Sequence, residues 1–173
     1  VLLVVDVAGY LTHRAEHALP ALWRIHRVHH SDPDLDLSTG LRFHPLEMIL
    51  RGSIAAGAMA VLGAPVAIVT GCVLFTSTIS LVSHVNADLM PTRVESLLQR
   101  LLVTPRMHRI HHSSNPQDMN SNFGTSLSIW DRMLGTHRTV PASDLAKMRF
   151  GVVERSAADS VSIGKMLVDQ VQG

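Results

Sequence analysis

An uncharged apolar stretch in the middle of the chain constrains its fold more than any other feature. From residue 52 to residue 83, thirty-two consecutive residues include no Asp, Glu, Lys or Arg. A run of this length exceeds an ordinary buried helix and is typical of a membrane segment. As one unbroken helix it would be about 48 Å long, whereas the hydrocarbon core of a bilayer is about 30 Å thick.

Gly63, Ala64 and Pro65 interrupt this stretch near its middle. We therefore predict a transmembrane hairpin at about 46–83, made of two helices near 46–62 and 65–83. Pro45 is a residue favoured at the first helical position, and Glu47 lies in the expected first turn. Because Gly and Pro are tolerated within membrane helices, one kinked span is the alternative.

The arginines around the hairpin predict its orientation. The loop at 63–65 carries no Lys or Arg, whereas the segments before and after the hairpin are rich in Arg. An excess of Lys and Arg marks the cytoplasmic side of a membrane protein. The residues concerned are Arg14, Arg24, Arg27, Arg42, Arg51, Arg93, Arg100, Arg106 and Arg109.

The rest of the composition is compatible with a single domain over residues 1–173. The chain opens on Val1 within an apolar pattern, so we interpret it as N-terminally truncated, with residues 1–12 as the end of a membrane helix. A net charge of +1 and few aromatic residues argue against a nucleic-acid partner. Cys72 is the single cysteine, which excludes an intrachain disulfide. Residues 158–171 are spaced like a modest amphipathic helix.

Histidines are the most informative polar residues of the chain. Of the eleven, eight fall in three boxes, HRAEH at 13–17, HRVHH at 26–30 and HRIHH at 108–112. On a helix, residues three and four apart share a face, so each box offers at least two imidazoles on one side. The residues are His13, His17, His26, His29, His30, His108, His111 and His112.

Imidazole-rich boxes without cysteine predict a transition-metal site. Imidazole suits zinc, copper, iron or nickel, whereas calcium and magnesium prefer oxygen ligands. Eight imidazoles exceed the ligands that one tetrahedral ion takes, so we expect two metal ions. The hairpin would bring the later box back to the membrane face of the earlier ones.

Three further histidines lie outside the boxes. His84 follows the hairpin and would complete a coordination sphere. His44 precedes the hairpin, and both a ligand role and a helix-capping or supporting role are open for it. His137 stands alone after a WDRMLGT segment, and we assign it no role.

The order of these motifs resembles the fatty acid hydroxylase/sterol desaturase superfamily of integral-membrane oxygenases. The resemblance rests on HRAEH, HRVHHS, RFHPLE, HVN, HRIHHS and NFGTSLSIWDRMLGT, in that order, over roughly residues 6–140. It implies an all-α, integral-membrane helical bundle in which a cytosolic, histidine-rich helical cap holds a dinuclear metal site. His137 departs from the family pattern, which more often has an aromatic residue there.

The resemblance also implies a chemistry and its ligands. A non-haem pair of iron ions would use dioxygen and two electrons to hydroxylate or desaturate a fatty acyl chain, sterol or related lipid. Partners would be the membrane, the lipid substrate and an external reductase, cytochrome or ferredoxin as electron donor. Zinc would replace iron on overexpression. The implied metal ligands are His13, His17, His26, His29, His30, His84, His108, His111 and His112.

Ligating imidazoles usually donate their second N–H group to a carboxylate or carbonyl. Candidate partners in this sequence are Asp6, Glu16, Glu47, Asn86 and Asp131. We expect Asp6 to share a helical stripe with His13 and His17.

Two other functions remain as alternatives. A metal-transport or metal-storage membrane protein would need polar ligands near the middle of the bilayer, where the expected spans carry none. A zinc hydrolase would need a carboxylate as general base, and HRAEH offers only Glu16, outside an HExxH arrangement.

Overall fold

The computed structural model describes residues 1–152, so the expected helix at 158–171 lies outside the described residues. Within residues 1–152 the fold is all-helical, with two isolated β-bridges and no strand, as predicted. The elements are α1 (Leu2–Ala18), α2 (Pro20–His30), the 3₁₀ helix η1 (Leu37–Leu41), α3 (Pro45–Val61), α4 (Val66–Ser83), α5 (Thr92–Leu98), α6 (Pro105–His111), α7 (Pro116–Met119), α8 (Ile129–Met133) and α9 (Ala142–Leu145).

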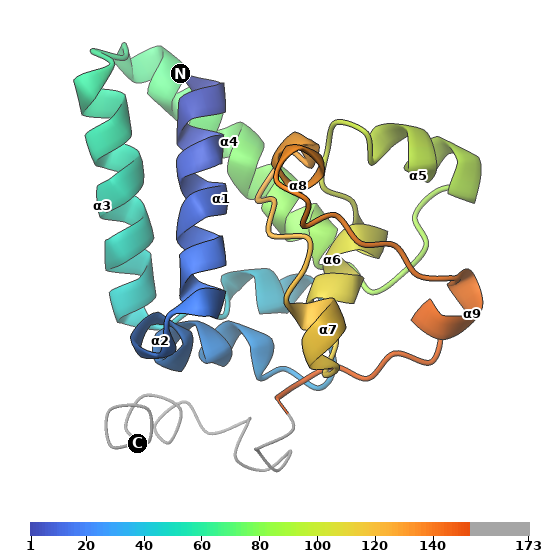
Figure 1. Cartoon of the computed structure of the whole chain (residues 1–173). Coiled ribbons are helices and arrows are strands. Elements are labelled where there is room, and N and C mark those ends of the chain that lie inside the picture. Colours follow the sequence, from blue (N-terminus) through green and yellow to red (C-terminus); the bar gives the residue numbers. More distant parts are fainter. Residues whose placement is uncertain (153–173) are drawn as a thin grey trace.

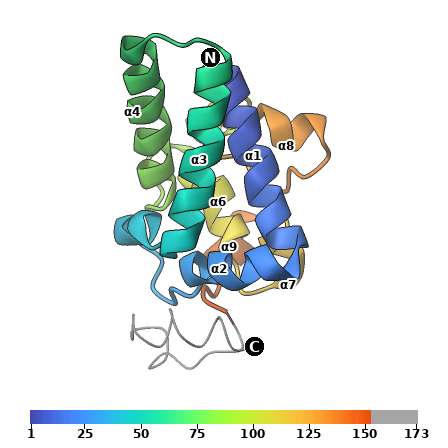
Figure 2. The same ribbon diagram turned by 90° about the vertical axis from the view of Figure 1, so that its left-hand side faces the viewer.

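The two long apolar helices have bounds close to those predicted. Residues 62–65 connect α3 and α4, and Gly63 takes a positive φ of 58° there, a conformation that glycine adopts without steric cost. α3 lies beside α1 in both views, whereas α4 leads back from the turn towards α6 (Figures 1 and 2). At 1.5 Å per residue each helix is about 26 Å long, slightly short of a full bilayer core.

α4 exposes apolar surface over most of its length. It is the described helix that is long and apolar enough to cross a membrane, with a mean hydropathy of 2.0 and 11% of its residues buried. A core helix of a water-soluble protein would be largely covered by its neighbours. α3 and α1 also leave large apolar residues exposed, among them Met48, Ile49 and Leu3.

Several of the shorter elements form a cap near one end of the long helices. α2 and η1 lie at the end of α1 and α3 that is opposite the α3–α4 turn, with α6 and α7 beside them, whereas α8 lies nearer the other end of α1 (Figures 1 and 2). The interior of this cap is unusually polar, because buried histidines there outnumber buried aliphatic side chains. Tyr10, Met107 and Ile110 are the large apolar side chains that are almost fully buried.

Asp6 joins the first helix to a segment far along the chain. Its carboxylate accepts hydrogen bonds from the backbone N–H groups of Ser126 and Leu127, both at 3.2 Å, and from Trp130 Nε1 at 2.7 Å. Asp6 is only 2% exposed. The hydrogen bonds supply the partners that a buried carboxylate requires, and they fix α1 beside α8.

Candidate metal centre

Nine histidines converge in the interior of the cap and form two separate groups. In each group the ring nitrogens that face one another lie within 4.8 Å, a spacing that could hold a metal ion. The five-histidine cluster contains His13, His17, His26, His30 and His111. The four-histidine cluster contains His29, His84, His108 and His112.

Each HxxHH box contributes to both clusters, in opposite proportions. In α2, His26 and His30 belong to the five-histidine cluster and His29 to the other. Around α6, His108 and His112 belong to the four-histidine cluster, and His111 to the five-histidine cluster. Residues four apart share a helical face, whereas the residue between them in the box points about 100° away from its neighbour. Each of the two HxxHH boxes therefore lies between the two clusters and contributes histidines to both.

Backbone carbonyls fix the orientation of four of these rings. His13 Nδ1 donates to the carbonyl of Phe123 at 2.9 Å, and His111 Nδ1 to that of Ser121 at 2.8 Å. His29 Nδ1 donates to the Arg42 carbonyl at 3.2 Å, and His84 Nδ1 to the Ser80 carbonyl at 2.6 Å. A carbonyl only accepts hydrogen bonds, so the proton of each neutral ring is on Nδ1 and the lone pair is on Nε2.

Within the four-histidine cluster these lone pairs face one another. His84 Nε2 lies 3.1 Å from His29 Nε2 and 2.9 Å from His108 Nε2. His29 and His84 both carry their proton on Nδ1, so no hydrogen can bridge their Nε2 atoms in the neutral state. Two lone pairs at this distance repel each other unless a cation lies against both. The donor set thus fits a transition-metal ion.

The five-histidine cluster fits a metal ion for a different reason. The Nε2 atoms of His13, His26 and His111, and both ring nitrogens of His17 and His30, are buried without a hydrogen-bond partner among the described residues. Buried polar atoms are normally paired, because leaving one unpaired costs about 1–3 kcal/mol. Five rings that each bring an unpaired, buried nitrogen to within 4.8 Å of the others are the expected arrangement of a ligand set.

Burial also keeps these imidazoles in the state that binds metals. It lowers the pKa of His111 to about 3 and that of His84 to about 4. Burial likewise holds the pKa of the other cluster histidines well below the usual 6.5, and neighbouring histidines lower it further. The rings are therefore neutral at pH 7, as a metal ligand must be.

One histidine has a carboxylate partner. His26 Nδ1 lies 2.8 Å from Glu47 Oε1 and 3.7 Å from Glu16 Oε2. Arg51 Nε lies 3.0 Å from Glu16 Oε1 and 3.2 Å from Glu47 Oε1, and its terminal nitrogen also pairs with Glu16. Glu16, His26 and Glu47 have the spacing of a further metal site. The Arg51 guanidinium group already occupies the position of a cation beside both carboxyl groups.

The other predicted supporting residues lie outside both clusters. Asn86 is exposed on the surface, and Asp6 holds the segment at 126–130. Asp131 accepts from the N–H groups of Phe123 and Gly124, at 2.7 and 2.8 Å. Asp131 therefore supports His13 only indirectly, through Phe123, whose carbonyl group orients the His13 ring. The expectation that Asp6, Asn86 or Asp131 bonds a cluster histidine finds no support in these contacts.

His44 and His137 are not members of either cluster. His44 Nδ1 accepts from the N–H group of Leu46 at 3.1 Å and caps the start of α3. Of the two roles left open for it, the structure therefore has the capping one. His137 follows α8 near Asp131.

Several neighbours of the clusters carry no signal in the sequence. Phe43 stacks on His29 with ring centroids 4.7 Å apart. Trp23 packs against His17 at 5.1 Å and His30 at 5.6 Å. Of these contacts, only the ion pair between Glu47 and Arg51 could be predicted from the sequence, because the two residues are four apart on one helix.

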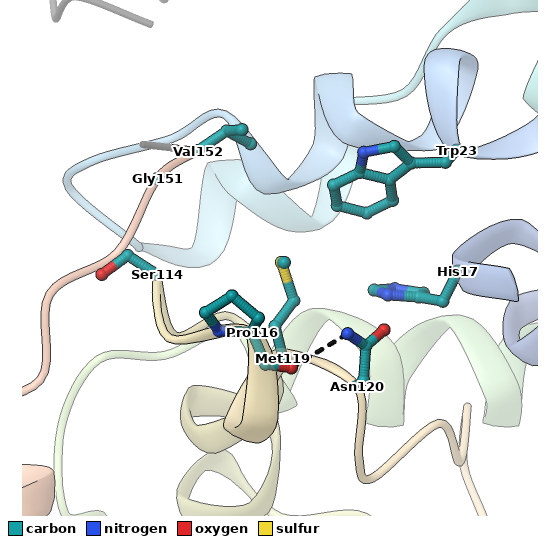
Figure 3. A pocket seen from close by; sticks show the side chains of 8 residues that line it. All are labelled: His17, Trp23, Ser114, Pro116, Met119, Asn120, Gly151 and Val152. Atoms are coloured by element: carbon teal, nitrogen blue, oxygen red, sulfur yellow. Dashed lines mark hydrogen bonds between the residues drawn. The ribbon is translucent and has the colours of Figure 1, made fainter. Parts of the chain in front are cut away.

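A cavity of about 230 Å³ leads from the surface to the five-histidine cluster. Figure 3 shows His17 and Trp23 directed towards Met119 and Asn120 across this cavity. His17 is the member of the cluster that lines it. The cavity is lined by residues of α1, α2 and α7. The facing ends of these helices lie away from the α3–α4 turn (Figure 1).

Two other cavities lie among the long helices. One, of about 200 Å³, is lined by residues of α1, α3 and α4 that include Gly9, Ile54 and Ala55. The second, of about 300 Å³, lies between α4 and η1. Thr76 and Thr125 line both cavities, and Phe43 lines the second. Through Phe43 this space reaches the ring of His29 in the four-histidine cluster.

Comparison with known proteins relates this chain to one family. The family model described as fatty acid hydroxylase matches residues 1–136. Ornithine lipid hydroxylase OlsE of Rhizobium tropici is 32% identical over 140 residues, which cover 81% of this chain and 41% of that protein. Alkylglycerol monooxygenase of Danio rerio is 35% identical over 142 residues, which cover 81% and 30%, respectively. The chain thus spans less than half the length of either relative, and no solved structure matches it.

Proposed function

Because this chain belongs to the fatty acid hydroxylase family, we propose that it is the catalytic part of a membrane-bound, dioxygen-dependent lipid hydroxylase or desaturase. The observation that carries the proposal is the pair of buried histidine clusters, whose nitrogens are left without protein partners or face one another as lone pairs. The named activities of the relatives support a lipid substrate.

We assign two iron ions to the two clusters, one in each. The ligands would be His13, His17, His26, His30 and His111 for one ion, and His29, His84, His108 and His112 for the other. When bound, the iron pair supplies the capacity to use dioxygen and two electrons to oxidise a C–H bond. Hydroxylation converts the C–H bond, dioxygen, two electrons and two protons into a C–OH group and water.

The protein's own groups hold the ligands rather than exchange protons with the substrate. Backbone carbonyls and Glu47 keep the proton of five rings on Nδ1 and leave Nε2 for the metal. With nitrogen ligands only, the charge of the ions is poorly compensated, which favours a strongly electrophilic centre. Such a centre suits the oxidation of an unactivated alkyl chain.

The lipid chain would reach the centre from the apolar side. The two cavities that share Thr76 and Thr125 lie along α4, whose surface is apolar and largely uncovered. The second of them is bounded by Phe43 against the four-histidine cluster. We therefore place the alkyl chain in this space, with its reacting carbon towards His29 and His84. Electrons from an external donor protein would arrive on the opposite side, where the cavity at His17 opens.

The membrane orientation of the sequence analysis remains part of the proposal. α3 and α4 would form the hairpin, with both histidine clusters at the cytoplasmic face. Cysteines at Asp34 and Asn86, which are exposed at the histidine end, would test it in a Cys72→Ser background. Both should react with an impermeant thiol reagent from the cytoplasmic side, and a cysteine at Leu62 from the other side. Labelling of positions 34 and 86 from opposite sides would contradict the hairpin.

The function itself is tested by lipid profiling. Cells that express the protein should contain an oxygenated or newly unsaturated lipid that cells expressing His111→Ala lack, because His111 would bind one of the ions. Elemental analysis of the two proteins, supplied with iron and purified anaerobically, should give about two metal ions per chain for the first and fewer for the variant. Identical lipid profiles from a protein that holds its two ions would refute the enzymatic proposal.

A further inference from the structure

The two clusters differ in the groups that accept hydrogen bonds from the Nδ1 atoms of their histidines. In the four-histidine cluster, His29 and His84 donate to backbone carbonyls. In the five-histidine cluster, His26 instead donates to the carboxylate of Glu47 at 2.8 Å. Among residues 1–152, no acidic side chain lies within ion-pairing distance of a histidine in the four-histidine cluster. The imidazole–carboxylate contact is thus confined to one site.

Glu47 belongs to a buried group of charges. The side chains of Glu16 and Glu47 are both 0% exposed, and that of Arg51 is 25% exposed. Arg51 contacts both carboxylates and holds them side by side against His26. Among the described residues, Arg51 is the cationic side chain that contacts this acidic pair, and the Glu47 oxygen at 2.8 Å bonds His26, a member of the five-histidine cluster. A cation bound in that cluster would lie next to the acidic pair in a buried region where water screens charge poorly.

A carboxylate behind a ligating imidazole has two effects on the metal. It keeps the ring proton on Nδ1, so the Nε2 lone pair is directed to the ion, and it makes that lone pair more basic. Loss of such a partner typically weakens metal binding by about 10- to 100-fold. A backbone carbonyl orients the ring in the same way but brings no charge. The five-histidine cluster therefore has one more ligand and an anionic partner that the other cluster lacks.

We propose that Glu47, held by Arg51 and Glu16, is a positioning residue that makes the five-histidine cluster the tighter of two unequal metal sites. Divalent ions then load in a fixed order, first in the five-histidine cluster and afterwards in the four-histidine cluster. This inference rests on the proposed metal centre, but it does not depend on which lipid is oxidised.

The test is a titration of the purified, metal-free protein with Co²⁺, followed by the visible absorption of the bound ion. The wild-type protein should show two phases of different affinity. His111→Ala should remove the tight phase, and His108→Ala the weak phase, which assigns each phase to a cluster. Glu47→Gln retains an amide oxygen that can accept the His26 proton but removes the charge. It should weaken the tight phase by about 10- to 100-fold and leave the weak phase unchanged.

Glu95→Gln is the matched control. Glu95 is also a buried glutamate, 3% exposed, and it accepts from the backbone N–H group of Arg106 at 3.1 Å rather than from a histidine. Its titration should match that of the wild type. If Glu47→Gln does not fold, Glu16→Gln removes the other carboxyl group of the pair, 3.7 Å from His26, while the His26–Glu47 hydrogen bond stays in place, and the tight phase should weaken.

Three results would overturn the proposal: one affinity for both ions in the wild type, equal weakening of both phases in Glu47→Gln, or an unchanged tight phase. The titration requires no substrate or electron donor. Two ordered phases without an oxygenated lipid in cells would leave this inference intact and refute the enzymatic function. An oxygenated lipid together with two equal affinities would support the enzymatic function and refute this inference.

Discussion

Among the glycines that the structure describes, Gly124 is the one where an added methyl group would meet the tightest contacts. A Cβ atom at this residue would lie 2.7 Å from the Leu127 carbonyl oxygen, 2.8 Å from Asp131 Oδ2 and 2.9 Å from Val103 Cγ2. Contacts below 3.0 Å are not tolerated, and two of these three atoms belong to the backbone or to a carboxylate already fixed by hydrogen bonds. The loop must therefore move.

The magnitude follows from what the loop holds. Overpacking of a tight interior costs about 1–3 kcal/mol. Displacement of residue 124 also shifts Phe123, whose carbonyl accepts the Nδ1 proton of His13. We expect Gly124→Ala to lower the free energy of unfolding by about 1–3 kcal/mol and to reduce the metal bound in the five-histidine cluster.

Thermal unfolding in detergent and elemental analysis measure the two effects. Gly57→Ala is the control, because nothing lies within 4 Å of a Cβ at that position in α3. There the same methyl group should leave stability unchanged or raise it by about 0.5–1 kcal/mol, since alanine is the better helix former. A Gly124→Ala protein with wild-type stability and metal content would refute the argument that the loop positions His13.

Three further predictions concern other parts of the chain. Thr76→Phe should fill the space shared by the two cavities and lower product formation, measured by lipid profiling, whereas Val73→Phe on the same helix, 48% exposed and in neither cavity, should not. His44→Ala should lower the free energy of unfolding by about 1 kcal/mol, because α3 loses its N-terminal cap, and should leave the metal content unchanged. Loss of an ion in this variant would instead identify His44 as a metal ligand. Metal-free protein should lose stability as the pH falls below about 6.5, by up to ~1.4 kcal/mol per pH unit for each buried histidine. The reason is that imidazoles of the unfolded chain take up protons there, whereas the folded ones, whose pKa is lowered, do not. Denaturant titrations at pH 7 and pH 5.5 that coincide would contradict this.

The sequence was sufficient to predict which residues gather, but not how they divide. Nine histidines were expected around two ions, and the same nine form the two clusters. The break at Gly63–Pro65 was visible because glycine and proline punctuate an otherwise uniform apolar run. The split of each HxxHH box between clusters depends on which way a helix is rotated about its axis. Rotation is set by contacts between distant residues, such as that of His29 with His84.

Supporting residues were harder to predict than ligands. Asp6 and Asp131 were suitable by residue type and position, yet their oxygens are used by the segment at 123–136. A carboxylate bonds whichever donors the folded chain brings to it, and backbone N–H groups without another partner compete with imidazoles. Glu47 became the partner of His26 because α2 and α3 meet at that point. Neither outcome follows from spacing along the chain.

His13 and Phe123, which form a hydrogen bond, are 110 residues apart in the chain. The ribosome therefore makes His13 well before it makes the carbonyl group that orients it. α1, α2 and the apolar helices α3 and α4 are complete before the ribosome reaches residue 100. Neither cluster can close then, because His108, His111, His112 and the carbonyl of Phe123 are still to be made. Since chains grow at about 5–20 residues per second, the early histidines wait for several seconds without their partners. In the proposed metal centre, metal capture would consequently be a late step of biogenesis, after the apolar helices are complete.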